Sequence, residues 1–382
     1  MPKRIISLFF SFVFIFNFAV WAEENNNSSS KQKLTEAKSA ILMEQTTKTP
    51  LYEQNADEKV QIASITKTMT MLLIMEAIES GKIKYTDMVQ TSEYAASMGG
   101  SQVFLEPGEE MSVHDMLKAI CVSSGNDAAV AMAEFVGGSN EAFVEMMNKR
   151  AKELGAKNTH FINCNGLDET KEHYSTARDV ALISCELLKH KDIQKYTKIW
   201  MDTLRDGKFG LSNTNKLIRF YKGANGIKTG STSAAKYCLS ASAERDGMQL
   251  VAVVLGAPST QERFGGATKL LDFGFANYSV FCGGEKEKNF KVCIKGGEED
   301  FAECKVSQGE NLVVKKGEEK KIKTKTNILN EIKAPAKKGE KVGEIKFMLG
   351  EKEVAKKDIC LFVDAKRISF LKMYAKLLKN IF

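Results

Sequence analysis

The most reactive arrangement in the sequence is a serine followed three residues later by a lysine, in Ser64-Ile65-Thr66-Lys67. In a helical turn, residues three apart lie side by side, so the lysine amine would stand next to the serine hydroxyl. An uncharged amine can accept the hydroxyl proton, and burial or a nearby cation favours that form. Because this spacing occurs by chance about once in a chain of 382 residues, it needs support from other motifs.

Two further motifs combine short polar side chains with glycine at positions where a ligand could bind. Ser124-Gly125-Asn126 falls between two expected helices, where short polar side chains can point into a cleft. The alternative is that Ser124 or Asn126 only caps the second helix. Lys228-Thr229-Gly230 comes just before an expected hairpin, and a glycine there lets a ligand approach a strand edge. The three motifs in this order are much more specific than any one of them.

A fold that mixes strands with helices must hold these motifs. Strands are expected at both ends of the first domain, and the helices between them show apolar residues at spacings of three and four. Asp246-Gly247 predicts the turn of a hairpin. The expected strands are 39–44, 51–53, 237–243 and 249–255, and the expected helices are 66–78, 113–122, 127–136, 140–154 and 262–275.

The pattern then changes to short alternating runs separated by Gly and Lys-Gly turns, which predicts a small all-β domain. Its expected strands are 290–294, 311–314, 345–349 and 359–363. We therefore predict an α/β (α+β) chain of five segments. They are a signal peptide (1–22), a linker (23–34), a catalytic domain (35–282), an all-β domain (283–364) and an amphipathic helix (365–382).

The net charge of +7 is concentrated at the two ends of the chain. Lys3 and Arg4 precede an apolar run at 5–20, and the final segment carries five basic residues without an acidic one, at 366, 367, 372, 376 and 379. The region between these ends has no net charge. A neutral body argues against a nucleic-acid-binding face, and a cationic tail favours an anionic surface such as lipid head groups.

Both ends indicate export and attachment. We predict a signal peptide that is cut after Ala22, because a basic start is followed by an apolar run that ends near this small residue. The alternative is an uncleaved anchor. It is disfavoured because the apolar run is shorter than the roughly 20 residues that span a bilayer. In the last eighteen residues the lysines share one narrow arc and apolar residues cover the rest, which predicts a helix in a membrane interface. The alternative is a helix packed on the protein's own core. We expect an exported protein at the outer face of the cytoplasmic membrane, or a secreted one.

Cysteines and histidines indicate neither a disulfide framework nor a metal site. The eight cysteines are scattered and form no CxxC pair, so we expect small buried hydrophobic side chains. The four histidines show no HxxxH spacing. We therefore expect no metal and no other cofactor.

The order SxxK, SxN, KTG is that of the serine-acylating, penicillin-recognising enzymes. The chain resembles the D-alanyl-D-alanine carboxypeptidases, which are the low-molecular-mass penicillin-binding proteins, and looks closest to their sporulation-associated branch. The similarity covers nearly the whole mature chain, including ASITKTMT, NTHFINCNGLDE, GIKTGST and IKAPAKKGEKVGEIKF. It implies a penicillin-binding transpeptidase fold with an antiparallel sheet and a helical cluster. The implied ligands are peptidoglycan stem peptides ending in D-Ala-D-Ala, and β-lactams, which would bind covalently.

The resemblance also implies a role for each matching residue. Ser64 would attack the carbonyl between the two D-alanines, and Lys67 would take its proton. The backbone N–H groups of Ser64 and Ser231 would form the oxyanion hole. Ser124 and Lys228 would relay a proton to the leaving amine.

Four more matching residues would hold the substrate. Asn126 would bind the substrate amide, and Gly230 would let the peptide approach the strand. Thr229 and Arg263 would grip the terminal carboxylate, for which a guanidinium is well suited. The alternative for Arg263 is an ordinary arginine on a helix surface.

Two residues depart from the family pattern: Lys236 stands where a glycine is expected, and Ser231 follows KTG where a larger residue is common. A perturbed edge strand would favour an inactive wall-binding or penicillin-sensing module. A β-lactamase is the other alternative, and it needs an acid that hydrolyses the acyl-enzyme. The nearest Glu-x-x-Asn, Glu145 to Asn148, falls on the surface of an expected helix, which favours the carboxypeptidase.

Overall fold

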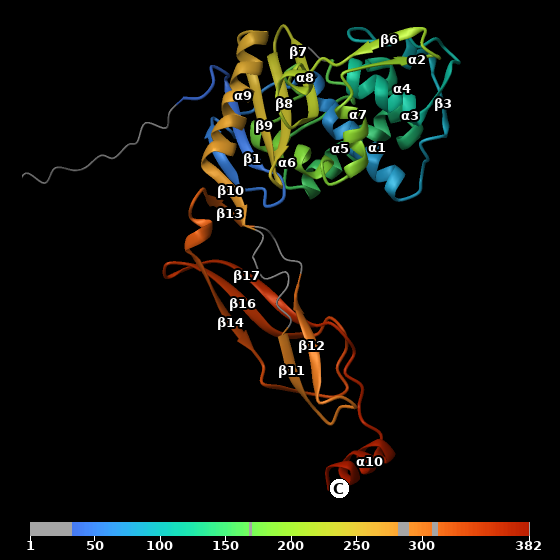
Figure 1. Cartoon of the computed structure of the whole chain (residues 1–382). Coiled ribbons are helices and arrows are strands. Elements are labelled where there is room, and N and C mark those ends of the chain that lie inside the picture. Colours follow the sequence, from blue (N-terminus) through green and yellow to red (C-terminus); the bar gives the residue numbers. More distant parts are fainter. Residues whose placement is uncertain (1–32, 168–169, 282–289, 308–311, 382) are drawn as a thin grey trace, which may run out of the picture. The chain divides into compact units, whose positions relative to one another are not determined.

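The computed structural model describes residues 33–167, 170–281, 290–307 and 312–381 (Figure 1). The predicted signal peptide and nearly all of the predicted linker lie outside these residues, and so do Cys282 and position 311, the first residue of one expected strand.

A five-stranded antiparallel sheet forms the centre of the first domain, with the strand order β2-β1-β9-β8-β7. Asp246 and Gly247 have φ values of 50° and 75°, as the type I′ turn of the predicted hairpin requires. The strands are β1 (Ser39–Glu44), β2 (Pro50–Gln54), β7 (Ala224–Thr232), β8 (Lys236–Arg245) and β9 (Met248–Ala257).

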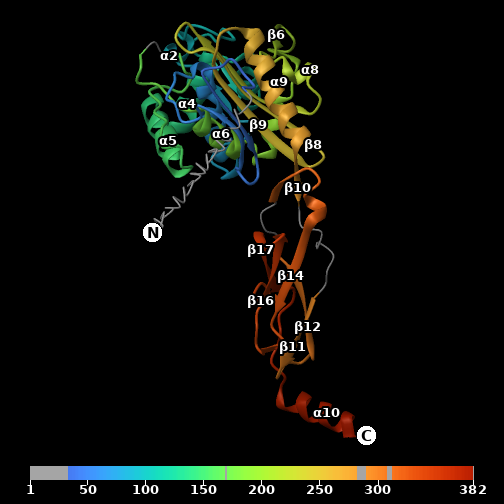
Figure 2. The same cartoon turned by 90° about the vertical axis from the view of Figure 1, so that its left-hand side faces the viewer.

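Helices cover both faces of this sheet because its strands are apolar on both sides. In β9, Val251, Val253 and Leu255 belong to one core, and the alternate residues Leu250 and Val254 belong to another. Helix α9 (Thr260–Asn277) contacts β8 and β9 in the second core, whereas α6 (Ala177–Leu187) contacts β1 and β9 in the first (Figures 1 and 2).

Most of the other helices form a cluster beyond α6 (Figures 1 and 2). They are α1 (Lys67–Glu79), α2 (Glu93–Ala96), α3 (Val113–Lys118), α4 (Asn126–Gly137), α5 (Asn140–Glu153) and α7 (Gln194–Thr197), with the short turns η1 (Ala63–Thr66), η2 (Ala119–Ser123) and η3 (Lys191–Ile193). Helix α8 (Leu217–Phe220) instead contacts β7 and contributes Leu217 to the second core. Two small antiparallel pairs are β3 (Met88–Gln90) with β4 (Glu110–Ser112), and β5 (Met201–Leu204) with β6 (Phe209–Ser212). The predicted antiparallel sheet with a helical cluster is confirmed.

One prediction about these elements is confirmed with a change of helix type, and another is wrong in part. The helix expected at 113–122 is present, but it is α-helical only as far as Lys118, and η2 continues it as a π-helix to Ser123. The cysteines are not all buried: Cys293 is exposed and Cys360 is partly exposed, because both alternate with core residues on strands of the small second domain.

The second domain is all β, as predicted. Its six-stranded sheet has the order β14-β16-β17-β12-β11-β15, and β10 pairs with β13. Side chains such as Val292, Ala302 and Ile359 form its core. The elements are β10 (Tyr278–Phe281), β11 (Phe290–Lys295), β12 (Phe301–Val306), β13 (Leu312–Lys315), η4 (Glu319–Lys321), β14 (Ile322–Ile328), β15 (Glu331–Lys333), β16 (Lys341–Leu349) and β17 (Lys352–Leu361).

Helix α10 (Phe370–Ile381) follows the second domain and leaves its apolar side chains exposed, including Phe370, Leu371 and Leu377. This exposure favours a helix in a membrane interface over a helix packed on the protein's own core. None of the helices in the described ranges combines the length and the apolar character needed to cross a bilayer.

Candidate active site

Ser64 and Lys67 meet at the junction of η1 and α1. Ser64 lies in the η1 turn and stays partly exposed, and Lys67 is the first residue of α1. The Lys67 Nζ lies 3.0 Å from the Ser64 Oγ. The Lys67 amine therefore lies next to the Ser64 hydroxyl, as predicted. The turn that brings them together is a 3-10 turn that leads into the helix.

Lys67 has two more oxygen neighbours, the side-chain oxygen of Asn126 and the carbonyl oxygen of Asn165 at 2.8 Å. The Asn126 amide nitrogen donates to the Gly99 carbonyl at 2.7 Å, which turns the amide oxygen toward Lys67. These two oxygens can only accept hydrogen bonds. An uncharged amine has two N–H donors for them, and its lone pair can then face the Ser64 hydroxyl, which among the described hydrogen-bond partners of Lys67 is the one with a hydrogen to give.

Burial explains why Lys67 can lose its charge. The Lys67 side chain is 0% exposed, and this desolvation, together with the nearby charge of Lys228, lowers its pKa well below the usual value. Burial also lowers the pKa of Lys228 to about 7, and the charge of Arg263 acts in the same direction. Both lysines can therefore lose a proton at a lower pH than an ordinary lysine, which suits them to proton transfer.

Strand β7 brings the KTG motif against the nucleophile. Lys228 and Thr229 are buried on β7, the edge strand of the sheet. A Cβ at Gly230 would lie 2.9 Å from the Ser64 backbone nitrogen, so only glycine permits this approach. Ser231 follows at once and is exposed. The backbones that carry Ser64 and Ser231 therefore lie close together.

Ser124 and Asn126 stand on either side of a tight backbone turn. Ser124 ends η2 with a φ of 65°, and Asn126 begins α4. The N-cap of α4 is Gly125, which has no side chain to accept a capping hydrogen bond, so the helix-cap alternative is wrong for this motif. Among the described residues the Ser124 hydroxyl makes no hydrogen bond to Lys67 or Lys228.

Arg263 is not a surface arginine, because it is 7% exposed and lies under the β7–β8 hairpin. Its guanidinium donates to the carbonyl oxygens of Gly230 at 3.3 Å and Cys238 at 3.4 Å. The Arg263 Nε has no partner within the described ranges. The described contacts thus join Arg263 to the backbone of the KTG strand.

The departure at Lys236 leaves the edge strand intact. Lys236 pairs with Thr232 as the last pair of the β7–β8 ladder, and it adopts a φ of 56°. The expected perturbation of the strand by a missing glycine is therefore wrong.

Three contributing residues escaped the sequence analysis. Asn165 acts through its backbone carbonyl, which no side-chain motif reveals; the Asn165-Gly166 turn dipeptide was the available signal. Gly166 has a φ of 79°, and a Cβ there would lie 1.9 Å from the Ala63 carbonyl oxygen. Thr214 accepts a 2.7 Å hydrogen bond from the Thr229 hydroxyl and is an exposed residue of the loop after β6.

Among the described residues no cluster of three or more His, Cys, Asp or Glu side chains could hold a metal ion. The groups that converge on Ser64 are amines, amides and hydroxyls, which serve acid–base and covalent chemistry.

Comparison with known proteins agrees with this chemistry. Residues 25–259 match the family model of D-alanyl-D-alanine carboxypeptidase, and residues 277–369 match that of the penicillin-binding protein 5 C-terminal domain. The chain is 46% identical to D-alanyl-D-alanine carboxypeptidase DacF of Bacillus subtilis, over 97% of this chain and 96% of that protein. It is 34% identical to DacC of Escherichia coli, over 94% and 91%.

The fold is shared with a solved structure as well. Penicillin-binding protein 5 from Haemophilus influenzae superposes with a TM-score of 0.75 at 32% identity, covering 87% of this chain and 98% of that one. The chain therefore belongs to the D-alanyl-D-alanine carboxypeptidase family, the serine-type hydrolases among the low-molecular-mass penicillin-binding proteins.

Proposed function

We propose that this carboxypeptidase removes the terminal D-alanine of peptidoglycan stem peptides through an acyl-enzyme on Ser64. The observation that carries the proposal is the set of hydrogen-bond partners of the buried Lys67 amine, of which, among the described residues, Ser64 is the one able to donate a proton. Lys67 takes the hydroxyl proton as the Ser64 oxygen attacks the carbonyl between the two D-alanines. The C–N bond then breaks, D-alanine leaves with a proton on its amine, and water hydrolyses the ester.

We assign the remaining steps by position. The backbone N–H groups of Ser64 and Ser231 stabilise the oxyanion, which the close approach of their backbones at Gly230 supports. Ser124 and Lys228 pass a proton to the leaving amine, and a Lys228 pKa of about 7 suits that role.

The same proposal assigns the substrate contacts. Asn126 binds the substrate amide while its own amide is held by Gly99 and Lys67. Thr229 faces the terminal carboxylate from the edge strand. Arg263, which is bonded to the Gly230 carbonyl, adds positive charge beneath that site.

Penicillin would acylate Ser64 and leave slowly. A fast β-lactamase needs a carboxylate that activates water beside the ester. Glu145, the acid considered for that role, is exposed on α5, and the loop that reaches Lys67 contributes the carbonyl of Asn165. The carboxylate of Asp127 is bonded to the backbone N–H groups of Val103 and Leu105. These contacts favour the carboxypeptidase over the β-lactamase.

We also propose that the protein is exported and contacts an anionic membrane surface through α10. The exposed apolar side chains of this helix and the basic composition of the last segment support such a contact. A place in the sporulation-associated branch remains a prediction from resemblance.

The experiment that tests the function uses the purified chain and the Ser64→Ala variant. Mass spectrometry after ampicillin treatment should find one adduct, on Ser64, and none in the variant. A peptide ending in D-alanyl-D-alanine should release free D-alanine only with the unaltered chain. An adduct without released alanine would favour the penicillin-sensing module, and rapid turnover of ampicillin would favour the β-lactamase.

A further inference from the structure

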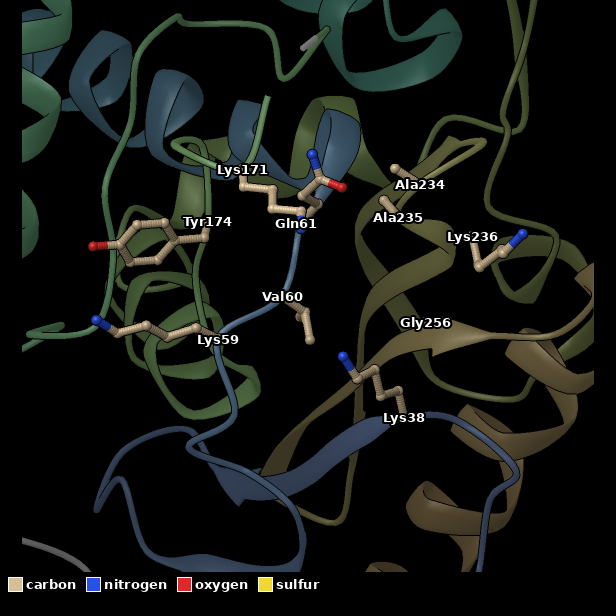
Figure 3. A pocket seen from close by; sticks show the side chains of 10 residues that line it. All are labelled: Lys38, Lys59, Val60, Gln61, Lys171, Tyr174, Ala234, Ala235, Lys236 and Gly256. Atoms are coloured by element: carbon tan, nitrogen blue, oxygen red, sulfur yellow. The ribbon is translucent and has the colours of Figure 1, made fainter. Parts of the chain in front are cut away.

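Four lysines line a pocket of about 440 Å³ beside the β7–β8 hairpin: Lys38, Lys59, Lys171 and Lys236. Figure 3 shows Lys59 and Tyr174 on one side of the pocket and Lys236 on the opposite side, with Lys38 between them. The rest of its wall comes from residues such as Val60, Gln61 and Ala234, and no acidic side chain lines it in the described part of the chain. We call this feature the lysine pocket.

The lysine pocket keeps most of its positive charge. Lys38 is paired with Glu58 at 2.9 Å, and the Lys59 ammonium lies 4.7 Å from the centre of the Tyr174 ring. Within the described ranges, Lys59, Lys171 and Lys236 form no ion pair. An aromatic ring attracts a cation without cancelling its charge, so three ammonium groups remain available to an anion.

Two segments that line this pocket lie close in sequence to the candidate nucleophile Ser64 and to Ser231. Gln61 lies three residues before Ser64 on one wall, and Ala234 lies three residues after Ser231 on the other. A second hollow, of about 400 Å³, is lined by residues that include Ser231, Ser233 and Lys236. Lys236 therefore lines both hollows. The second hollow is also lined by Ser231, whose backbone N–H is proposed for the oxyanion hole.

The backbone of Lys236 gives an independent reason to look for a role. Its φ of 56° lies in the left-handed region, which glycine adopts freely and a lysine adopts only against strain. Its side chain is exposed, so burial in a core does not offset this strain. A strained residue whose charged side chain separates two hollows next to an active site is suited to ligand contact.

We propose that the lysine pocket binds a free carboxylate of the donor stem peptide, about two or three residues upstream of the scissile bond. This inference rests on the proposed function, which puts the terminal carboxylate at Thr229 and the scissile carbonyl at Ser231. A peptide extended along the β7 edge then continues toward Thr232, the last residue of that strand, and toward the turn that holds Ala234.

The chemistry favours a carboxylate on the peptide itself. Lys236 lines both hollows and Ser231 lines the second, so a peptide whose carbonyl meets Ser64 would pass close to the lysine pocket. Ammonium groups at an exposed site attract a carboxylate modestly, and salt weakens the attraction. The lysine pocket would therefore select among stem peptides according to their upstream charge.

Two peptides test this proposal. Both peptides end in D-alanyl-D-alanine. They differ at the third residue upstream of the scissile bond, where one has glutamate and the other glutamine. With the full chain at low salt, we expect kcat/KM to be about fivefold higher for the glutamate peptide. The ratio should fall toward one in the double variant Lys171→Gln, Lys236→Gln. It should persist in Lys236→Arg and in Lys149→Gln, a matched change of an exposed lysine on α5.

Binding of dye-labelled peptides to the Ser64→Ala variant, measured by fluorescence anisotropy, separates the pocket from catalysis. The glutamate peptide should bind more tightly, and the two lysine substitutions should remove the difference. Equal binding of both peptides, or a preference that survives these substitutions, would overturn the proposal. Tighter binding without D-alanine release from the unaltered chain would reject the proposed function and leave the pocket standing.

Discussion

The two buried lysines predict the pH range in which the proposed reaction can run. In the proposed mechanism Lys67 acts as a base when uncharged, so acylation should slow as the pH falls below its lowered pKa. In the same mechanism Lys228 donates a proton and supplies charge when protonated, so the rate should also fall as the pH rises above about 7. Because Lys67 must be uncharged and Lys228 must be protonated, the rate should show a bell-shaped dependence on pH.

Removing the Lys228 charge should move the acid limb of that profile. In Lys228→Gln the cation that disfavours a protonated Lys67 is gone, so the pKa of Lys67 rises and the acid limb shifts to higher pH. The alkaline limb should disappear, and the rate should fall about 10²-fold or more. The measurement is the second-order rate constant of acylation by penicillin from about pH 4 to about pH 10.

Lys149→Gln is the control for this experiment, since it removes an exposed lysine from α5. It should keep both limbs in place. An unchanged acid limb in Lys228→Gln would contradict the coupling of the two amines.

Sequence motifs identified the side chains of this site better than its backbone groups. Ser64, Lys67, Lys228 and Thr229 were predicted because their side-chain types and order are specific. The carbonyl of Asn165 was not, because every residue has a carbonyl and only the folded chain selects one.

At the level of elements, the nucleophile depends on a tight contact between two turns. Ala63 precedes Ser64 with a φ of 48°, and Gly166 packs on the Ala63 carbonyl. The Gly166 turn also carries the Asn165 carbonyl that contacts Lys67. The position of the amine and that of the hydroxyl are therefore set by one contact.

Gly166→Ala should damage both stability and acylation. The added methyl group would lie 1.9 Å from the Ala63 carbonyl oxygen, and the φ of 79° is itself unfavourable for alanine. We expect the free energy of unfolding to fall by about 2 to 4 kcal/mol and the acylation rate to drop with it. Chemical denaturation and penicillin acylation measure the two effects.

Gly81→Ala provides the matched control. Gly81 has a similar φ of 75°, but no atom lies within 4 Å of its added Cβ. The free energy of unfolding of Gly81→Ala should fall only by the cost of the unfavourable φ, about 1 to 2 kcal/mol, and the acylation rate should not change. Equal losses in the two variants would mean that the contact with Ala63 does not position the site.

The sequence predicted the elements whose pattern is local and strong. The β8–β9 hairpin follows from Asp246-Gly247 between apolar runs. Strand β14 was not predicted, because its residues KTKTN are exposed and polar and only pairing with β16 makes them a strand. The π-helical turn η2 also has no sequence signal of its own, since 113–122 shows an ordinary helical pattern.

For the whole molecule, the proposed membrane attachment through α10 would be separate from catalysis. Lys372 and Lys376 pair with Glu298 and Asp300 of the second domain, at 2.9 Å and 2.5 Å, while apolar side chains such as Phe370 stay exposed. Exposed surface pairs of this kind are weak and screened by salt. The apolar side chains therefore provide the larger part of any attachment energy.

A chain truncated after Ser369 should lose membrane binding and keep its activity. The full chain should sediment with vesicles that contain anionic lipid, less so at high salt, and the truncated chain should stay in the supernatant. Release of D-alanine from a soluble peptide should be the same for both. Sedimentation of the truncated chain, or failure of the full chain to sediment, would contradict attachment through α10.

Strand β7 ends the five-stranded sheet and pairs only with β8 within the described ranges. Natural proteins usually protect such an edge, because its free N–H and C=O groups can recruit a foreign strand. In the proposed function this open edge is part of the substrate site, so its N–H and C=O groups must remain available to the substrate. A short, stiff, extended backbone that ends in a carboxylate and lacks a cleavable bond would occupy the same opening. An inhibitor that binds this edge would therefore not need the reactive four-membered lactam ring of penicillin.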